Sequence, residues 1–102
     1  MEKVQILCIG RDPVVLQKLS RFILENPKWE STATVDDITA NEIFNQRKFD
    51  IVLLLDDIDD ASEKNFHSMF EKNNPDVIFI KHKGASTGLL AAEINEALER
   101  KG

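Results

Sequence analysis

The sequence predicts a three-layer α/β/α protein built around a parallel sheet. Short, continuously apolar segments recur along the chain, as expected of strands that are buried on both faces. Amphipathic segments with helical spacing separate them, so strands and helices alternate as in right-handed βαβ units. The 102 residues are enough for a domain with a core of its own, and we expect a single domain over residues 1–102.

The first strand and helix are predicted by an apolar segment and a clear helix start. Val4 to Ile9 is rich in β-forming residues and ends at Gly10. Asp12 is a suitable N-cap acceptor, and Pro13 suits the first helical position. Apolar residues then recur at helical spacing until Asn26-Pro27 ends the pattern: Val15, Leu16, Leu19, Phe22 and Ile23.

The second unit is more polar. Trp29 to Val35 is rich in threonine and alternates weakly, which is typical of a half-exposed edge strand, and we expect Trp29 to be partly exposed. Thr39 and Glu42 have the spacing of a capping box, which predicts a short helix that ends near Lys48. The apolar stripe of that helix consists of Ala40, Ile43 and Phe44.

The third strand, from Asp50 to about Leu55, is continuously apolar after its first residue and is expected at the centre of the sheet. The helix after it ends at residues 73–75 and has one apolar face, formed by Phe66, Met69 and Phe70.

A fourth strand is expected from Val77 to Ile80, followed by a basic turn from Lys81 to Gly84. The last helix is expected to fray at residues 100–102, and its apolar positions are Leu89, Leu90, Ala92, Ile94, Ala97 and Leu98.

Composition narrows the classes of partner and compartment. The net charge of -5 and the pI of about 5.0 disfavour nucleic acid and anionic membranes, because both favour clustered Lys and Arg. The single cysteine, Cys8, cannot form an internal disulfide. No segment has the character of a signal peptide or the length of a membrane span, and we expect a cytoplasmic protein.

The order of these segments resembles the receiver domain of response regulators, the CheY-like family of bacterial two-component signalling. The resemblance implies a flavodoxin-like three-layer α/β/α sandwich whose four-stranded parallel sheet has the order 2-1-3-4, without the family's fifth strand. It is carried by Val4-Gln5-Ile6-Leu7-Cys8-Ile9 before Asp12-Pro13, by Phe49-Asp50-Ile51-Val52-Leu53-Leu54, and by Pro75-Asp76-Val77-Ile78-Phe79-Ile80.

The positions that carry the family's chemistry differ in this chain. The two acids that hold Mg²⁺ correspond to Gly10 and Arg11, with Asp12 at the variable position that follows them. The phosphate-accepting aspartate corresponds to Leu55, and the hydroxyl residue that ends the fourth strand to Lys81. A guanidinium cannot ligate a hard cation, which prefers oxygen donors. The resemblance therefore implies a degenerate site without catalytic or metal-binding residues, formed by Gly10, Arg11, Asp12, Leu55, Asp56, Asp57 and Lys81.

The leading hypothesis is a non-catalytic, phosphorylation-independent, receiver-like (pseudo-receiver) module that needs no cofactor and acts by protein contact. Arg11 and Lys81 are expected to neutralise the acids after the third strand in place of a cation. Without a fifth strand the fourth strand is an exposed edge, and exposed edges pair or need protection. We expect a homodimer or a partner complex through this edge, at Val77, Ile78, Phe79 and Ile80.

Two alternatives remain open. In an active but atypical receiver, Asp56 or Asp57 would be phosphorylated and Asp56, Asp57 and Asp59 would hold Mg²⁺, and Asp56 reaches the acceptor position only through a one-residue bulge in the strand. With Asp60, these acids otherwise form a solvated loop that favours the start of the next helix.

The second alternative is a small phosphotransfer enzyme that resembles the IIB components of sugar phosphotransferase systems and uses Cys8. The residues after Cys8 lack the hydroxyl-rich phosphate loop of that family, which favours a buried, inert thiol.

Overall fold

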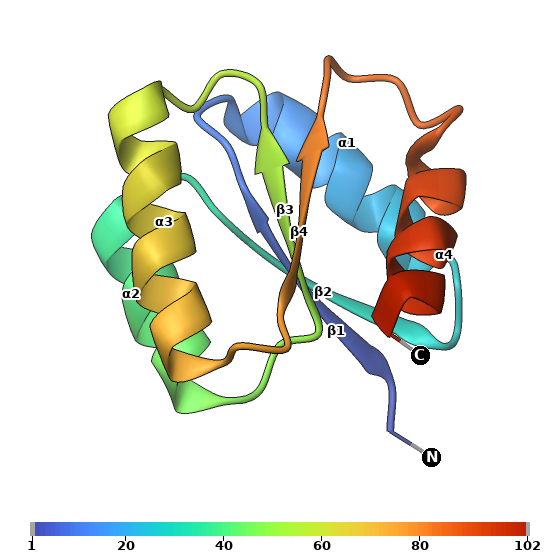
Figure 1. Cartoon of the computed structure of the whole chain (residues 1–102). Helices are drawn as coiled ribbons and strands as arrows, with labels where there is room; N and C mark the ends of the chain where they lie inside the picture. Colours follow the sequence, from blue (N-terminus) through green and yellow to red (C-terminus); the bar gives the residue numbers. More distant parts are fainter. Residues whose placement is uncertain (1, 102) are drawn as a thin grey trace.

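Helices cover both faces of a four-stranded parallel sheet in the computed structural model, which describes residues 2–101 (Figure 1). The strand order is β2-β1-β3-β4, as predicted. The elements are, in chain order, β1 (Val4–Ile9), α1 (Pro13–Leu24), β2 (Trp29–Thr34), α2 (Asp37–Gln46), β3 (Ile51–Leu55), α3 (Asp60–Asn73), β4 (Ile78–His82) and α4 (Leu90–Lys101).

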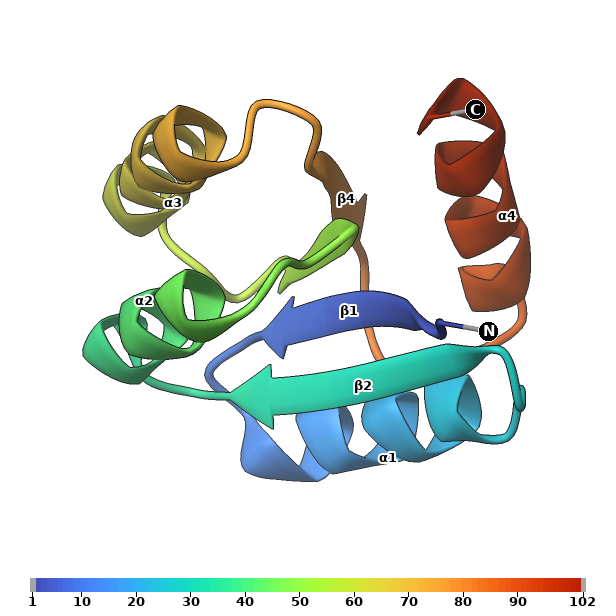
Figure 2. The same ribbon diagram turned by 90° about the horizontal axis from the view of Figure 1, so that it is seen from below.

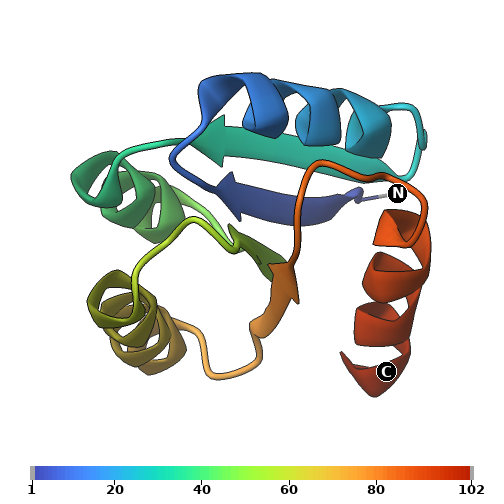
Figure 3. The same cartoon turned by 90° about the horizontal axis from the view of Figure 1, so that it is seen from above.

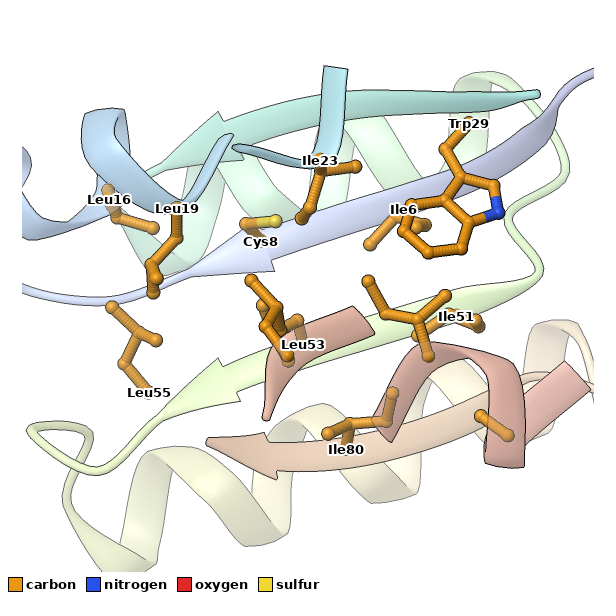
Figure 4. Close-up of a cluster of buried hydrophobic side chains, with 13 residues drawn as sticks. Ile6, Cys8, Leu16, Leu19, Ile23, Trp29, Ile51, Leu53, Leu55 and Ile80 are labelled. Carbon is orange, nitrogen blue, oxygen red and sulfur yellow. The ribbon is translucent and has the colours of Figure 1, made fainter. Parts of the chain in front are cut away.

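The core has two halves, one on each face of the sheet. α1 and α4 cover one face, and α2 and α3 cover the other (Figure 2). All five residues of β3 are buried and alternate between the two halves, which confirms the predicted central strand. Figure 4 shows the half beneath α1 and α4, where Leu53 and Leu55 of β3 pack with residues of β1 and α1.

Helix α1 begins as the sequence predicts. Asp12 is the N-cap, and its Oδ1 accepts hydrogen bonds from the backbone N–H groups of Val14 at 2.9 Å and Val15 at 3.4 Å. Pro13 occupies the first turn, where a missing N–H costs nothing.

Two expectations about the second unit are wrong. The N-cap of α2 is Asp36, whose Oδ2 accepts from both the backbone N–H and the hydroxyl of Thr39 at 2.8 Å, so Thr39 lies within the first turn. The helix ends at Gln46, close to the predicted end near Lys48. Trp29 is buried, with only 6% of its surface exposed, because its ring packs against Ile6 beneath the α1 and α4 layer (Figure 4).

Strand β4 is shifted toward the C-terminus relative to the predicted range Val77–Ile80. Lys81 pairs with Leu54 and His82 with Leu55, so these residues extend the ladder instead of forming a basic turn. His82 is buried because its Nδ1 lies 2.6 Å from a Glu93 carboxylate oxygen and its Nε2 lies 2.8 Å from the Ser86 carbonyl oxygen.

The third and last helices differ from the predicted patterns in detail. Phe66 and Phe70 are buried, whereas Met69 is 39% exposed at the margin of that face. Leu89 is 72% exposed and precedes α4, which begins at Leu90 and remains helical through Lys101, while Gly102 of the predicted frayed end lies outside the described residues. None of the helices within residues 2–101 combines the length and apolar character that a membrane span requires.

Candidate functional site

The loops that follow β1 and β3 lie together at one edge of the sheet, with the end of β4 beside them (Figures 1 and 3). Parallel strands bring their carboxyl ends to the same edge, which is where open α/β sheets bind ligands. The structure therefore brings together the two segments that the sequence singles out, residues 10–12 and residues 55–57, with Lys81 at the end of β4.

Leu55 packs directly onto Gly10. A Cβ atom placed on Gly10 would lie 2.9 Å from Cγ and 3.1 Å from Cβ of Leu55, closer than side-chain atoms normally approach. Gly10 is buried, and Leu55 is 2% exposed within the apolar cluster of Figure 4. Neither residue has a side-chain oxygen, so two of the receiver-site positions are occupied by an apolar contact.

Asp57 connects the two loops. Its Oδ2 accepts hydrogen bonds from the backbone N–H groups of Arg11 at 2.9 Å and Asp12 at 3.0 Å. The Asp12 carboxylate caps α1, as described above. These carboxylate oxygens already serve backbone donors, which stabilise one arrangement of the loops.

The Arg11 guanidinium extends away from the acids that follow β3. Its Nη1 lies 2.6 Å from Asp37 Oδ1 at the start of α2 and donates to the Val35 carbonyl oxygen at 2.7 Å. Its Nη2 donates to the Ser62 hydroxyl in α3 at 3.2 Å. The expectation that this side chain neutralises the acids after β3 is wrong, because only the backbone N–H of Arg11 contacts one of them, Asp57.

Lys81 does lie near acids of the loop after β3 and of α3. Its Nζ is 2.9 Å from Glu63 Oε1 in the first turn of α3. The hydrogen bond and the charge of Glu63 raise the pKa of Lys81, with smaller contributions from Asp60 and Asp56. The sequence reasoning missed Glu63 as the direct partner, although Glu63 lies one turn before Phe66 of the predicted helix.

The acids after β3 do not converge on one point. Asp59 is the N-cap of α3 but makes no capping hydrogen bond with its side chain, and Asp60 begins that helix. Among residues 2–101, no three His, Cys, Asp or Glu side chains group as a metal site would require. At the receiver's metal positions, Gly10 and the Arg11 guanidinium do not fit a Mg²⁺ ion, which needs oxygen ligands.

Strand β3 carries no bulge that would move Asp56 into the acceptor position. Each residue from Ile51 to Leu55 pairs with one residue of β4 in unbroken register. Leu55 therefore keeps the place that the ungapped comparison with the family assigns to it.

Cys8 is enclosed in the middle of β1. It is 0% exposed, and burial raises the pKa of the thiol to about 11, against a weaker opposing effect of the Ser31 hydroxyl 3.6 Å away. The thiolate, which is the nucleophilic form, is therefore scarce near neutral pH. The environment supports the interpretation of Cys8 as an inert core residue.

The predicted interaction edge lies at the edge of the sheet, as expected from the strand order. Val77 and Ile80 are each 7% exposed, whereas Ile78 and Phe79 are half-buried. Phe79 stacks on His67 of α3 with a ring separation of 3.8 Å. The side chains thus face the two helical layers, and the backbone of β4 forms the edge.

Comparison with solved structures identifies the architecture. No protein-family model and no curated protein matches the chain. The signal receiver domain of an HD domain-containing protein from Pseudomonas fluorescens Pf-5 superposes with a TM-score of 0.68 at 15% identity, covering 99% of this chain and 90% of that one. The chain has the CheY-like receiver fold.

Two further receiver-fold structures agree. The BeF3-activated DrrB receiver domain has a TM-score of 0.64 at 17% identity, with 93% of this chain and 78% of that chain covered. Chemotaxis protein CheY4 from Vibrio cholerae has a TM-score of 0.57 at 11% identity, with 98% and 99% covered. At these identities the similarity establishes the receiver fold, and the role of each site residue has to be argued from its own contacts.

Proposed function

We propose that this receiver-fold chain is a non-enzymatic, phosphorylation-independent module that acts by protein contact and uses neither a metal nor a cofactor. The observation that carries the proposal is the contact between Leu55 and Gly10. A receiver needs carboxylate oxygens at the corresponding positions, one to accept phosphate and one to hold Mg²⁺. Here the apolar side chain of Leu55 fills the space above Gly10, which has no side chain.

The hydrogen bonds around this contact support a site held in one state. The Asp57 carboxylate is bound by two backbone N–H groups, and Lys81 is paired with Glu63. Both interactions form within the chain itself. Because the loops are stable in this arrangement without a ligand, we expect no second loop arrangement that phosphorylation would favour.

We infer that the contact surface is the β4 edge, from Val77 to Ile80, which would bind a protein partner or a second copy of the chain. The strand is at the end of the sheet, and unpaired strand edges readily accept another strand. The net charge of -5 is unfavourable for nucleic acid or an anionic membrane as the partner. A cytoplasmic location stays a prediction.

Intact mass after incubation with Mg²⁺ and either acetyl phosphate or beryllofluoride tests the proposal. We expect no adduct. An adduct that disappears in Asp56→Asn or Asp57→Asn would overturn the proposal in favour of an active receiver. An adduct that disappears in Cys8→Ser would instead support cysteine phosphotransfer.

Titration with Mg²⁺ followed by amide resonances provides an independent readout. We expect the resonances of residues 56–60 to stay in place at low millimolar Mg²⁺. Saturable shifts confined to that loop would show a cation site and contradict the proposal even if no covalent adduct formed.

A further inference from the structure

The outer edge of β4 presents a short set of backbone hydrogen-bonding groups. Successive strand residues direct their N–H and C=O groups to opposite sides, and the N–H of Ile78 donates inward to the Asp50 carbonyl oxygen at 3.1 Å. By this alternation Phe79 and Lys81 direct their backbone groups outward. No strand lies on that side within residues 2–101. The edge therefore offers two residues for pairing.

The chain before β4 limits where an added strand can bind. The N–H of Val77 already donates to the Asn74 carbonyl oxygen at 3.1 Å. Pro75 has no N–H to donate. A strand that pairs with this edge must therefore be centred on Phe79 and Lys81.

The backbones of the neighbouring helices do not cover this edge. α3 and α4 lie on opposite faces of the sheet beside β4, and neither ribbon crosses the outer side of the strand (Figure 3). A partner strand would extend the sheet and bring its own covering helices next to α3 and α4.

The charges along the edge favour an antiparallel partner with the same charge order. Asp76 precedes β4, whereas Lys81 and Lys83 lie at its carboxyl end, and all three are exposed. A parallel copy would place lysines beside lysines, which is destabilising. An antiparallel copy brings Asp76 of each chain toward the end of β4 that carries the lysines of the other chain. The order of charges along β4 is therefore complementary to that of an antiparallel second copy of β4.

We propose that β4 pairs antiparallel with β4 of a second copy of this chain, with the two-fold axis passing through Ile80. The inference rests on the proposed function, for which it names the partner. In this register Phe79 of each chain lies opposite Lys81 of the other. Each of these two equivalent pairs exchanges both N–H···O bonds, so every outward group of the edge is used.

Neighbouring registers satisfy the edge less well. An axis through Phe79 sets Lys81 opposite Val77, whose N–H is already bound by Asn74. An axis through Lys81 sets two like charges directly opposite each other. An axis between residues would pair an outward-facing residue with an inward-facing one. The axis at Ile80 avoids all three problems, and its two-fold symmetry closes the assembly as a dimer.

Sedimentation velocity with proline and alanine variants tests the pairing. Lys81→Pro removes an outward N–H and spares the ladder to β3, whereas Lys81→Ala removes the Glu63 contact but keeps that N–H. We expect a dimer for the wild type and for Lys81→Ala at high micromolar concentration, and a monomer with unchanged circular dichroism for Lys81→Pro. A monomeric wild type overturns the proposal, as does a folded Lys81→Pro dimer.

Cysteine variants read the register directly and do not depend on the proline variant folding. Residues on the two-fold axis have Cα atoms about 4.5 to 5.5 Å apart, within disulfide range, so Ile80→Cys should crosslink on oxidation. The wild type, whose only cysteine is the buried Cys8, should not crosslink. Crosslinking of Phe79→Cys or Lys81→Cys in place of Ile80→Cys would move the axis and overturn the proposal.

A failure of the β4 pair can be distinguished from a failure of the proposed phosphorylation independence. If none of the three variants crosslinks, the β4 pair is wrong, whatever the mass experiment gives. An aspartyl adduct would refute phosphorylation independence without changing the expected dimer.

Discussion

The side chain of Leu55 lies against the backbone of Gly10, so residues 45 positions apart close the end of the sheet as one apolar unit. Each residue constrains the other, because a larger residue at position 10 would collide with Leu55, and a smaller one at position 55 would leave a cavity. The two departures from the receiver pattern are therefore compensating features of one packing arrangement.

This contact predicts strong coupling between the two positions. Gly10→Ala should destabilise the fold by about 1–3 kcal/mol through overpacking, and Leu55→Ala by about 2–5 kcal/mol through lost burial. The double variant should be more stable than the sum predicts, because the added Cβ enters space that Leu55 vacates. Urea unfolding of the four proteins measures the coupling.

Gly88→Ala is the matched control for that cycle. A Cβ on Gly88 would meet only the Ser86 hydroxyl at an ordinary 3.5 Å. We expect its effect to stay within about 0.5 kcal/mol. Additive effects of Gly10→Ala and Leu55→Ala would contradict the close approach.

Loss of Asp57 should loosen the loop after β1. Asp57→Ala removes the acceptor of the Arg11 and Asp12 N–H groups, so we expect a loss of about 1 kcal/mol and faster hydrogen exchange at those two amides. Asp56→Ala removes an exposed neighbouring acid and serves as the control. Equal exchange rates in the two variants would show that Asp57 does not hold the loop.

Cys8 should be protected from alkylation while the protein is folded. Burial raises the pKa of the thiol to about 11 from its ordinary value of 9.0, so the folded state favours the protonated form. The associated stability is fully present below about pH 9 and is lost as the pH rises toward 11. At pH 8 we expect labelling by iodoacetamide only through unfolding, at a rate that rises with urea. Rapid labelling in native buffer would contradict a closed core around Cys8.

The Asp36 cap should make the start of α2 sensitive to acid. Hydrogen bonds from the Thr39 N–H and hydroxyl lower the pKa of Asp36 below 3.8, with a small contribution from Arg11. The resulting stabilisation is present above pH 3.8 and is lost as the pH falls through the lowered pKa. We expect Asp36→Ala to lower the Tm at pH 7 and to approach the wild type in strong acid.

Asp36→Asn tests whether the helix cap depends on the negative charge of the Asp36 side chain. Asparagine also caps helices, so this variant should retain most of the helix start while losing the titration. An Asp36→Ala deficit that stays constant down to pH 2 would show that the carboxylate charge does not contribute.

Two errors of the sequence reasoning have identifiable structural causes. Thr39 with Glu42 satisfied the capping-box spacing, but Asp36 offered an acceptor one turn earlier and the helix began there. Lys81 and His82 looked like a turn because they are polar. They continue β4 because Leu54 and Leu55 of β3 provide ladder partners up to that point.

The sequence by itself determined the order of the elements, the parallel sheet with its order 2-1-3-4, and the absence of carboxylates at positions 10 and 55. The order of the elements follows from apolar periodicity and caps, and the missing carboxylates follow from residue identity, which are local signals. The strand order 2-1-3-4 was implied by the resemblance to receiver domains. Only the tertiary structure decided the partners of the charged residues. Arg11 reaches Asp37 and Ser62, while Asp57 binds backbone donors 45 and 46 positions away, because loops distant in the chain meet where parallel strands end.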